Sequence, residues 1–217
     1  MIQSNVVEQI PSNKHVLVCG MTGTGKSFLT EQYTKGYRYV VKLDTKGETD
    51  ERHLEGKSAW EGLEEGKDFT ICRHLEELDE IDTDKIIYVP DFEEQNEDTF
   101  DMFFKWIFER GNTVLWIDEL MSIGTVFKYP KNLKRIYTQG RSKNVGVWAC
   151  TQRPSGIPDC SPANSSYFFV FDMMLPQDRK KMSESTGTTE MMKLPEGYNF
   201  WYYKLGERKA VKACLKL

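Results

Sequence analysis

The chain has 217 residues, a length typical of one domain, and 39% of them are hydrophobic, which is enough to fill a core. Its net charge of −4 argues against a general nucleic-acid-binding protein. We see no apolar run long enough to span a membrane and no signal peptide at the N-terminus. The five cysteines are scattered, without a C-x-x-C pair. We therefore expect a reduced, soluble, intracellular protein without a disulfide framework.

Charge is distributed unevenly along the chain. Residues 44–101 contain 21 acidic and 6 basic side chains, whereas residues 120–158 contain seven basic side chains and no acidic one. Two solvated faces of an ordinary protein would explain this pattern. The basic stretch, however, lies between two motifs of a nucleotide site, described below. The basic stretch is therefore also a candidate surface for contact with a negatively charged partner.

The hydrophobic pattern predicts strands alternating with helices. Residues 1–13 form a polar entry segment, and residues 49–67 have a weak pattern that is helical or irregular. Strands are expected at 15–19, 37–43, 69–72, 85–89, 113–117, 145–150 and 167–171. Helices are expected at 27–33, 96–110, 131–139 and 176–186, with Asn96 capping the second. The alternation predicts one α/β domain, residues 1–217, with a mostly parallel sheet between helices and a C-terminal hairpin at 199–215.

Residues 20–27 match the phosphate-binding loop pattern G-x-x-x-x-G-K-[ST], between an expected strand and an expected helix. Backbone N–H groups turned inward by the glycines bind phosphate oxygens, and the helix N-terminus adds partial positive charge. We expect Lys26 to reach the β- and γ-phosphates and Ser27 to bind Mg²⁺. The alternative is a chance match on a turn rich in Gly and Thr. The candidate nucleotide-binding residues are Gly20, Met21, Thr22, Gly23, Thr24, Gly25, Lys26, Ser27 and Phe28.

Two acidic residues follow the expected strand 113–117. Open parallel sheets place their ligand chemistry at the carboxyl ends of the strands. We expect Asp118 to bind Mg²⁺, directly or through water, and Glu119 to act as the general base on the attacking water. The alternative is that the pair only opens a loop or caps the next helix. The full phosphate loop favours the catalytic interpretation.

Polar residues also surround the expected strand 145–150. Gln152, just after it, is expected to contact the γ-phosphate and the attacking water. The alternative is a simple turn before Pro154. Arg141, before the strand, is a candidate arginine finger for the γ-phosphate of a neighbouring subunit. From the residues alone, it could equally be a favourable charge at a helix C-terminus.

Together, these motifs resemble the FtsK–HerA superfamily of DNA-translocating ATPases. The Thr151-Gln152-Arg153-Pro154 element after an Asp-Glu strand is the most specific part of this resemblance. The Asp44-Thr45-Lys46-Gly47-Glu48 turn is similar to a turn common in the superfamily, and residues 167–187 also fit. The resemblance covers residues 13–205. Because the chain is small and lacks additional domains, it is most similar to the genome-packaging ATPases of tailless, membrane-containing viruses and phages.

The resemblance implies a RecA-like (ASCE-type) P-loop NTPase fold and a ring of subunits, usually a hexamer. It implies that ATP with Mg²⁺ is hydrolysed to drive double-stranded DNA through the ring, in the host cytoplasm or at the virion. A capsid or membrane vertex protein is a possible partner. The resemblance favours Arg141 as the finger, with Arg153 as the second candidate.

The residues that we expect to contact DNA lie between the base and Gln152. They are Lys128, Lys131, Lys134 and Arg135. Their contacts would be made with backbone phosphates and would be independent of sequence. Three alternatives remain: a related ring ATPase that acts on protein, a conjugation-type DNA pump, and a nucleotide-dependent scaffold. Glu119 argues against the scaffold, which has no need of a base.

Overall fold

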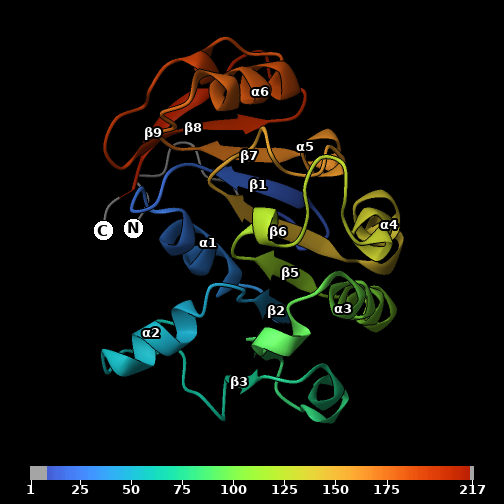
Figure 1. Cartoon of the computed structure of the whole chain (residues 1–217). Coiled ribbons are helices and arrows are strands. Elements are labelled where there is room, and N and C mark those ends of the chain that lie inside the picture. Colours follow the sequence, from blue (N-terminus) through green and yellow to red (C-terminus); the bar gives the residue numbers. More distant parts are fainter. Residues whose placement is uncertain (1–8, 216–217) are drawn as a thin grey trace.

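The computed structural model describes residues 9–215 (Figure 1). Their strands form one nine-stranded sheet in the order β3-β4-β2-β5-β6-β1-β7-β8-β9. Its members are β1 His15–Cys19, β2 Val40–Leu43, β3 Phe69–Cys72, β4 Lys85–Tyr88, β5 Val114–Ile117, β6 Gly146–Thr151, β7 Tyr167–Val170, β8 Asn199–Lys204 and β9 Val211–Cys214. Neighbours from β3 to β7 are parallel, and β8 and β9 are antiparallel. The predicted sheet and hairpin are confirmed.

Helices cover both faces of this sheet. They are α1 Lys26–Thr34, α2 Glu48–Leu54, α3 Glu97–Arg110, α4 Lys131–Gln139, α5 Cys160–Asn164 and α6 Pro176–Thr186. Figure 1 shows α1 and α2 on one side of the sheet and α3 and α4 on the other. Among residues 9–215, we find no helix that is long and apolar enough to cross a membrane.

Alternate residues of each buried strand enter two separate cores. Leu17 of β1 packs in the core that contains Phe104 of α3 and Ile136 of α4. Its neighbour Val18 packs in the core that contains Leu29 of α1. Because a strand with both faces covered must be apolar at every position, its pattern is a continuous apolar run rather than an alternation. This explains why the short runs in the sequence predicted the strands well.

The ends of α3 agree with the sequence prediction. The Asn96 side chain accepts a hydrogen bond from the backbone N–H of Thr99 (3.0 Å), as an N-cap does. Gly111 follows the last turn with a φ of +62°, a conformation that L-amino acids with side chains rarely adopt. The bounds predicted for α4 and α6 also match those of the structure.

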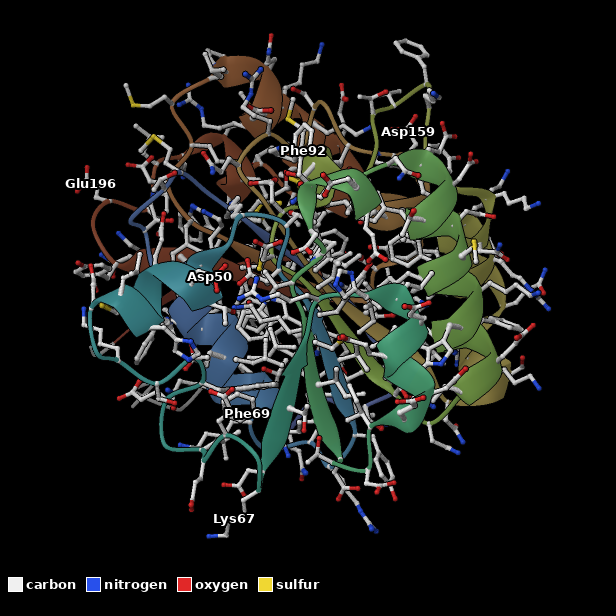
Figure 2. The ribbon with its side chains drawn as sticks, turned by 60° about the horizontal axis from the view of Figure 1, so that its bottom comes forward. Asp50, Lys67, Phe69, Phe92, Asp159 and Glu196 are labelled. Atoms are coloured by element: carbon white, nitrogen blue, oxygen red, sulfur yellow. The ribbon has the colours of Figure 1, made fainter. Side chains whose placement is uncertain are left out.

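Other segments differ from the prediction. β2 begins at Val40 rather than at residue 37, and α5 was not anticipated. Residues 49–67, expected to be helical or irregular, are both: they contain α2 from its second residue onward, followed by an irregular segment. Trp60 anchors this segment, because its ring is fully buried and lies 5.7 Å from that of Trp116. Figure 2 shows this segment between Asp50 on α2 and Phe69 at the start of β3. Of the expected entry segment, residues 1–8 lie outside the described residues.

The cysteines are free thiols throughout residues 9–215, which contain all five of them. Cys19 on β1 and Cys150 on β6 are fully buried, as the apolar strands predicted. Burial raises the pKa of the Cys150 thiol to about 11, so it remains protonated at neutral pH.

Candidate nucleotide-binding and catalytic site

The phosphate loop connects β1 to α1 by a backbone that depends on glycine. Gly20, Gly23 and Gly25 have φ values of +154°, +79° and +101°. A Cβ on Gly20 would lie only 2.6 Å from the Cβ of Phe171, so this position has no room for a side chain. Sequence and structure therefore agree on a tight turn that leads directly into the first turn of α1.

The Lys26 ammonium lies within the loop, and its contact with phosphate remains a prediction. Its ammonium donates a hydrogen bond to the carbonyl of Met21 in the same loop (2.8 Å), and the residue is only 6% exposed. Burial lowers the pKa of Lys26, and the charge of Lys46 lowers it further. Ser27 follows it in the first turn of α1, while Phe28 packs against the core beneath this helix. Contact of Phe28 with a nucleotide remains a prediction.

The expected catalytic residues meet at one edge of the sheet. β5, β6 and β1 are adjacent and parallel, so their carboxyl ends lie side by side. The backbone N–H of Gly20 donates to the carbonyl of Thr151 (3.1 Å), which ties the phosphate loop to the end of β6. The N–H of Gln152 donates to Glu119 (3.4 Å), which ties β6 to the end of β5. The predicted grouping of loop, carboxylates and Gln152 is therefore present.

Asp118 has the properties of a metal ligand. It is 3% exposed, and its Oδ1 accepts two hydrogen bonds from Thr45, from the backbone N–H and from the hydroxyl (both 3.1 Å). Its Oδ2 is buried and has no hydrogen-bond partner among the described residues. A buried carboxylate oxygen without a partner is costly, and a Mg²⁺ ion or its water would satisfy it. Asp118 and Ser27 would hold that ion together with nucleotide phosphates.

The surroundings of Asp118 raise its pKa to about 7, through burial and through the nearby charge of Asp44. Burial would also raise the pKa of Asp44, but Lys42 and hydrogen bonds from Thr49 outweigh it and lower this pKa. Without metal, the folded chain therefore holds a proton on Asp118 that the unfolded chain loses near pH 4. The stability contributed by this proton falls as the pH rises from about 4 to 7.

Replacing Asp118 with Asn should raise the melting temperature of the magnesium-free chain at pH 8 by several degrees. The change removes a buried charge, and each pKa unit corresponds to about 1.4 kcal/mol. At pH 5, Asp118 is already neutral, so its replacement should change the melting temperature little. Thermal unfolding in EDTA at both pH values measures the difference. An equal shift of the melting temperature at both pH values would show that ionisation of Asp118 does not destabilise the folded chain.

Glu119, the expected base, is 6% exposed and contacts Lys46, a lysine outside the phosphate loop. Its Oε2 lies 3.1 Å from the ammonium of Lys46. Its Oε1 accepts long hydrogen bonds from the N–H groups of Met121 and Gln152 (both 3.4 Å). Sequence reasoning gave Lys46 no role, although the turn that carries it was noted. The contact joins the ends of β2 and β5, which are neighbours only in the folded sheet.

Gln152 begins a segment that is anchored by Asp178 at the start of α6. Asp178, 1% exposed, accepts hydrogen bonds from the guanidinium of Arg153 (2.9 Å) and from the N–H (3.0 Å) and hydroxyl (2.6 Å) of Ser155. A buried carboxylate with three donors fixes the backbone just after Gln152. Arg153, the second finger candidate, therefore has an intramolecular partner in this structure.

Arg141 lies far from the phosphate loop of its own chain. It belongs to a short 3₁₀ turn, Gly140–Lys143, just before β6. Because β6 and β1 are parallel, this turn lies at the amino ends of the two strands, whereas the phosphate loop lies at their carboxyl ends. Its charge instead acts on His15 at the start of β1, whose pKa falls to about 4, mainly through burial. Arg141 cannot serve its own nucleotide site, and its role toward a neighbouring subunit remains a prediction.

The basic stretch packs against acidic residues of α3. Lys128 forms an ion pair with Glu97 (2.7 Å), and Lys131 lies 3.9 Å from Asp101. Arg135 lies over the ring of Phe108, 3.9 Å from its centroid, and Lys134 is exposed. The sequence count suggested a purely positive region, because it could not include acidic neighbours from another helix. Exposed ion pairs of this kind are weak. Contact of these residues with DNA remains a prediction.

No protein-family model matches this chain, and no curated protein matches its sequence. Solved structures do match its fold. The genome packaging NTPase B204 from Sulfolobus turreted icosahedral virus 2, in complex with ATPγS, is 18% identical with a TM-score of 0.74. The match covers 96% of this chain and 100% of that one.

Two further matches are more distant. VirB4 of Thermoanaerobacter pseudethanolicus is 12% identical, with a TM-score of 0.63 over 94% of this chain and 89% of that one. The pCW3 conjugation coupling protein TcpA, with ATPγS, is 16% identical, with a TM-score of 0.59 over 94% of this chain and 60% of that one. The chain has the P-loop NTPase fold of these proteins. The resemblance that the motifs indicated is confirmed at the level of the fold.

Proposed function

We propose that this chain is an ATPase that moves double-stranded DNA and packages a viral genome into a preformed capsid. One observation carries the proposal: the fold of the genome packaging NTPase B204 is matched over that chain's whole length. The neighbours that bind ATPγS support ATP as the nucleotide. We further propose that residues 1–217 form one ATPase domain and that it acts in the host cytoplasm or at the virion.

The site supplies a role for each residue in hydrolysis. Backbone N–H groups of the phosphate loop and Lys26 hold the phosphates. Ser27 and Asp118 would hold Mg²⁺, which would supply positive charge next to the phosphate oxygens. Glu119 orients the attacking water and accepts its proton, because its carboxylate lies at the carboxyl end of β5 beside the loop. Gln152 contacts the γ-phosphate from the end of β6.

A ring of copies completes the mechanism. Arg141 lies at the amino end of β6, away from the phosphate loop at the carboxyl ends of the strands. It would therefore act on the nucleotide of the next subunit, in a ring that we propose is a hexamer. Lys128, Lys131, Lys134 and Arg135 would face the DNA backbone. They lie on the loop and helix that follow Glu119, so a change at the base reaches them along the chain. A capsid or membrane vertex protein is the proposed docking partner.

The proposal predicts that long double-stranded DNA stimulates ATP hydrolysis and that added salt removes the stimulation. Replacing Lys128 and Lys131 with Ala together should leave basal turnover unchanged and weaken DNA binding by roughly tenfold, with a shallower salt dependence, because two phosphate contacts are lost. Steady-state turnover and fluorescence anisotropy with labelled duplex DNA measure the two effects.

A double replacement of Lys180 and Lys193, exposed lysines of α6 and of the segment that follows it, is the matched control. Unchanged DNA affinity in the Lys128/Lys131 variant would remove this loop from the account. Turnover indifferent to DNA in the unmodified chain would favour an ATPase that acts on protein. A conjugation-type pump would also be stimulated by DNA. Distinguishing such a pump from a packaging ATPase requires a binding or packaging assay with the capsid partner.

A further inference from the structure

Two consecutive residues of one turn contact the two carboxylates that follow β5. Thr45 donates to Asp118 through its N–H and its hydroxyl (both 3.1 Å), and the ammonium of Lys46 lies 3.1 Å from Glu119. The turn connects β2 to α2, and β2 is the neighbour of β5 in the sheet. Both carboxylates of the candidate catalytic pair are therefore contacted by a segment outside the phosphate loop.

The backbone of this turn is fixed. The Asp44 carboxylate, fully buried, accepts hydrogen bonds from the N–H of Glu48 (3.1 Å) and from the N–H (2.8 Å) and hydroxyl (2.6 Å) of Thr49, at the start of α2. Gly47 provides the turn with a φ of +72°. The position of Lys46 on the rim of the site is thereby defined by its anchored neighbours.

The Lys46 side chain is much less constrained than its backbone. It is 39% exposed, and its ion pair with Glu119 is the only salt bridge found for it among residues 9–215. An ion pair with one partner so exposed contributes little to stability, and lysine has a long flexible stem with three donors on its ammonium. Lys46 can therefore leave Glu119 when a stronger anion is present.

A second cation, Lys26, lies in the electrostatic field of Glu119. Burial is the main cause of the lowered pKa of Lys26; the charge of Lys46 lowers it further, and the charge of Glu119 acts in the opposite direction on Lys26 and raises the pKa of Lys46. The phosphates of a nucleotide held by Lys26 would bring several negative charges between these residues. In the proposed mechanism, the terminal phosphate extends beyond the loop toward Glu119, so it would lie nearer to the present partner of Lys46 than the other phosphates would.

We propose that Lys46 exchanges Glu119 for the γ-phosphate when a nucleoside triphosphate binds. Without the triphosphate, Lys46 neutralises Glu119 and occupies the oxygen that would accept a proton from water. With it, the ammonium moves to the γ-phosphate and frees the Glu119 carboxylate for the attacking water. Lys46 thus makes the base available only when there is a phosphate to cleave. This inference rests on the proposed ATPase function.

The exchange predicts selective loss of triphosphate affinity in Lys46→Met. Its affinity for the non-hydrolysable analogue AMP-PNP with Mg²⁺ should fall by about tenfold, the effect of losing one charge-assisted hydrogen bond, whereas ADP affinity should change less than about twofold. Lys46→Arg, which keeps the charge, should recover most of the loss. Lys57→Met, which removes another ion-paired lysine of the same acidic region, is the matched control and should change neither affinity.

A double-mutant cycle with Glu119→Gln tests the exchange itself. Removing the carboxylate releases Lys46 from its partner, so Glu119→Gln should bind AMP-PNP several-fold more tightly than the unmodified chain. Part of this gain should disappear in the Lys46→Met background, because no ammonium is left to be released. Isothermal titration calorimetry of the four proteins gives all the constants, and no step requires turnover.

Three results would overturn the inference. Lys46→Met could bind AMP-PNP as the unmodified chain does, which would mean that Lys46 never reaches the γ-phosphate. It could lose AMP-PNP and ADP affinity equally, which would indicate a structural effect on the turn. The cycle could be additive, which would mean that the two side chains do not compete. An unmodified chain that binds neither nucleotide would instead refute the proposed function.

Discussion

Replacing Glu119 with Gln should reduce ATP turnover by about a thousandfold while ATP binding is retained. Gln keeps the shape of the side chain and can still accept hydrogen bonds from the N–H groups of Met121 and Gln152, but it cannot take a proton from water. The loss of the ion pair with Lys46 should change stability little, because Lys46 is 39% exposed. Steady-state hydrolysis and nucleotide titration on one preparation separate the two effects.

The matched control for this variant is Glu55→Gln, which removes an exposed glutamate that is also paired with a lysine. It should hydrolyse ATP at the rate of the unmodified chain. A turnover of Glu119→Gln within a few-fold of that rate would eliminate Glu119 as the base. The scaffold alternative would then regain support, since the base was the main argument against it.

Replacing Lys26 with Ala should weaken ATP binding by about a hundredfold and abolish measurable hydrolysis, because two or more charge-assisted contacts to phosphate are lost. The fold should survive. Within residues 9–215, the Lys26 ammonium makes one hydrogen bond, to the Met21 carbonyl in its own loop, and burial makes its charge costly in the nucleotide-free protein. Calorimetric titration with ATP and Mg²⁺ measures the affinity, and thermal unfolding measures the stability.

Lys180→Ala serves as the comparison, because Lys180 is a well-exposed helical lysine of α6. It should bind ATP as the unmodified chain does. Retained ATP affinity in Lys26→Ala would mean that the loop at Gly20 holds something other than the phosphates of a nucleotide. A large fall in melting temperature would mean that the ammonium stabilises the empty loop, contrary to its lowered pKa.

Much of the fold could be predicted because its elements have local signals. Strands buried on both faces are short apolar runs, and this continuous pattern located β1, β5 and β6 within a residue or two. α3 was predicted well because its cap at Asn96 and its stop at Gly111 are encoded beside it. The segment around Trp60 was not predicted well, because its few apolar residues are ordered by packing on Trp116, which is distant in the sequence.

The candidate site divides in the same way. The phosphate loop, Asp118 and Glu119 were predicted because each is a contiguous motif at the end of an apolar strand. Lys46 and Asp178 were missed as partners, because their contacts join strand ends and helices that are distant in the sequence. Asp178 has a weak signal, since it lies in the first turn of a helix that begins with proline.

Charge was the least reliable guide. The count from residue 120 to 158 contains no acidic side chain, yet Lys128 pairs with Glu97 and Lys131 lies near Asp101. Both acids are on α3, which packs beside α4 (Figure 1). A linear charge map cannot include such partners, because it does not contain the packing of helices. The proposed DNA-contacting surface is therefore better judged by measured salt dependence than by counting charges.

The most direct test of DNA translocation is displacement of a third strand from a triplex placed on long duplex DNA. The account predicts ATP-dependent release of the labelled third strand by the purified chain with Mg²⁺. It predicts no release with AMP-PNP or by the Glu119→Gln and Lys26→Ala variants. A chain that hydrolyses ATP in the presence of this DNA and leaves the triplex intact would contradict the central claim that hydrolysis moves the duplex.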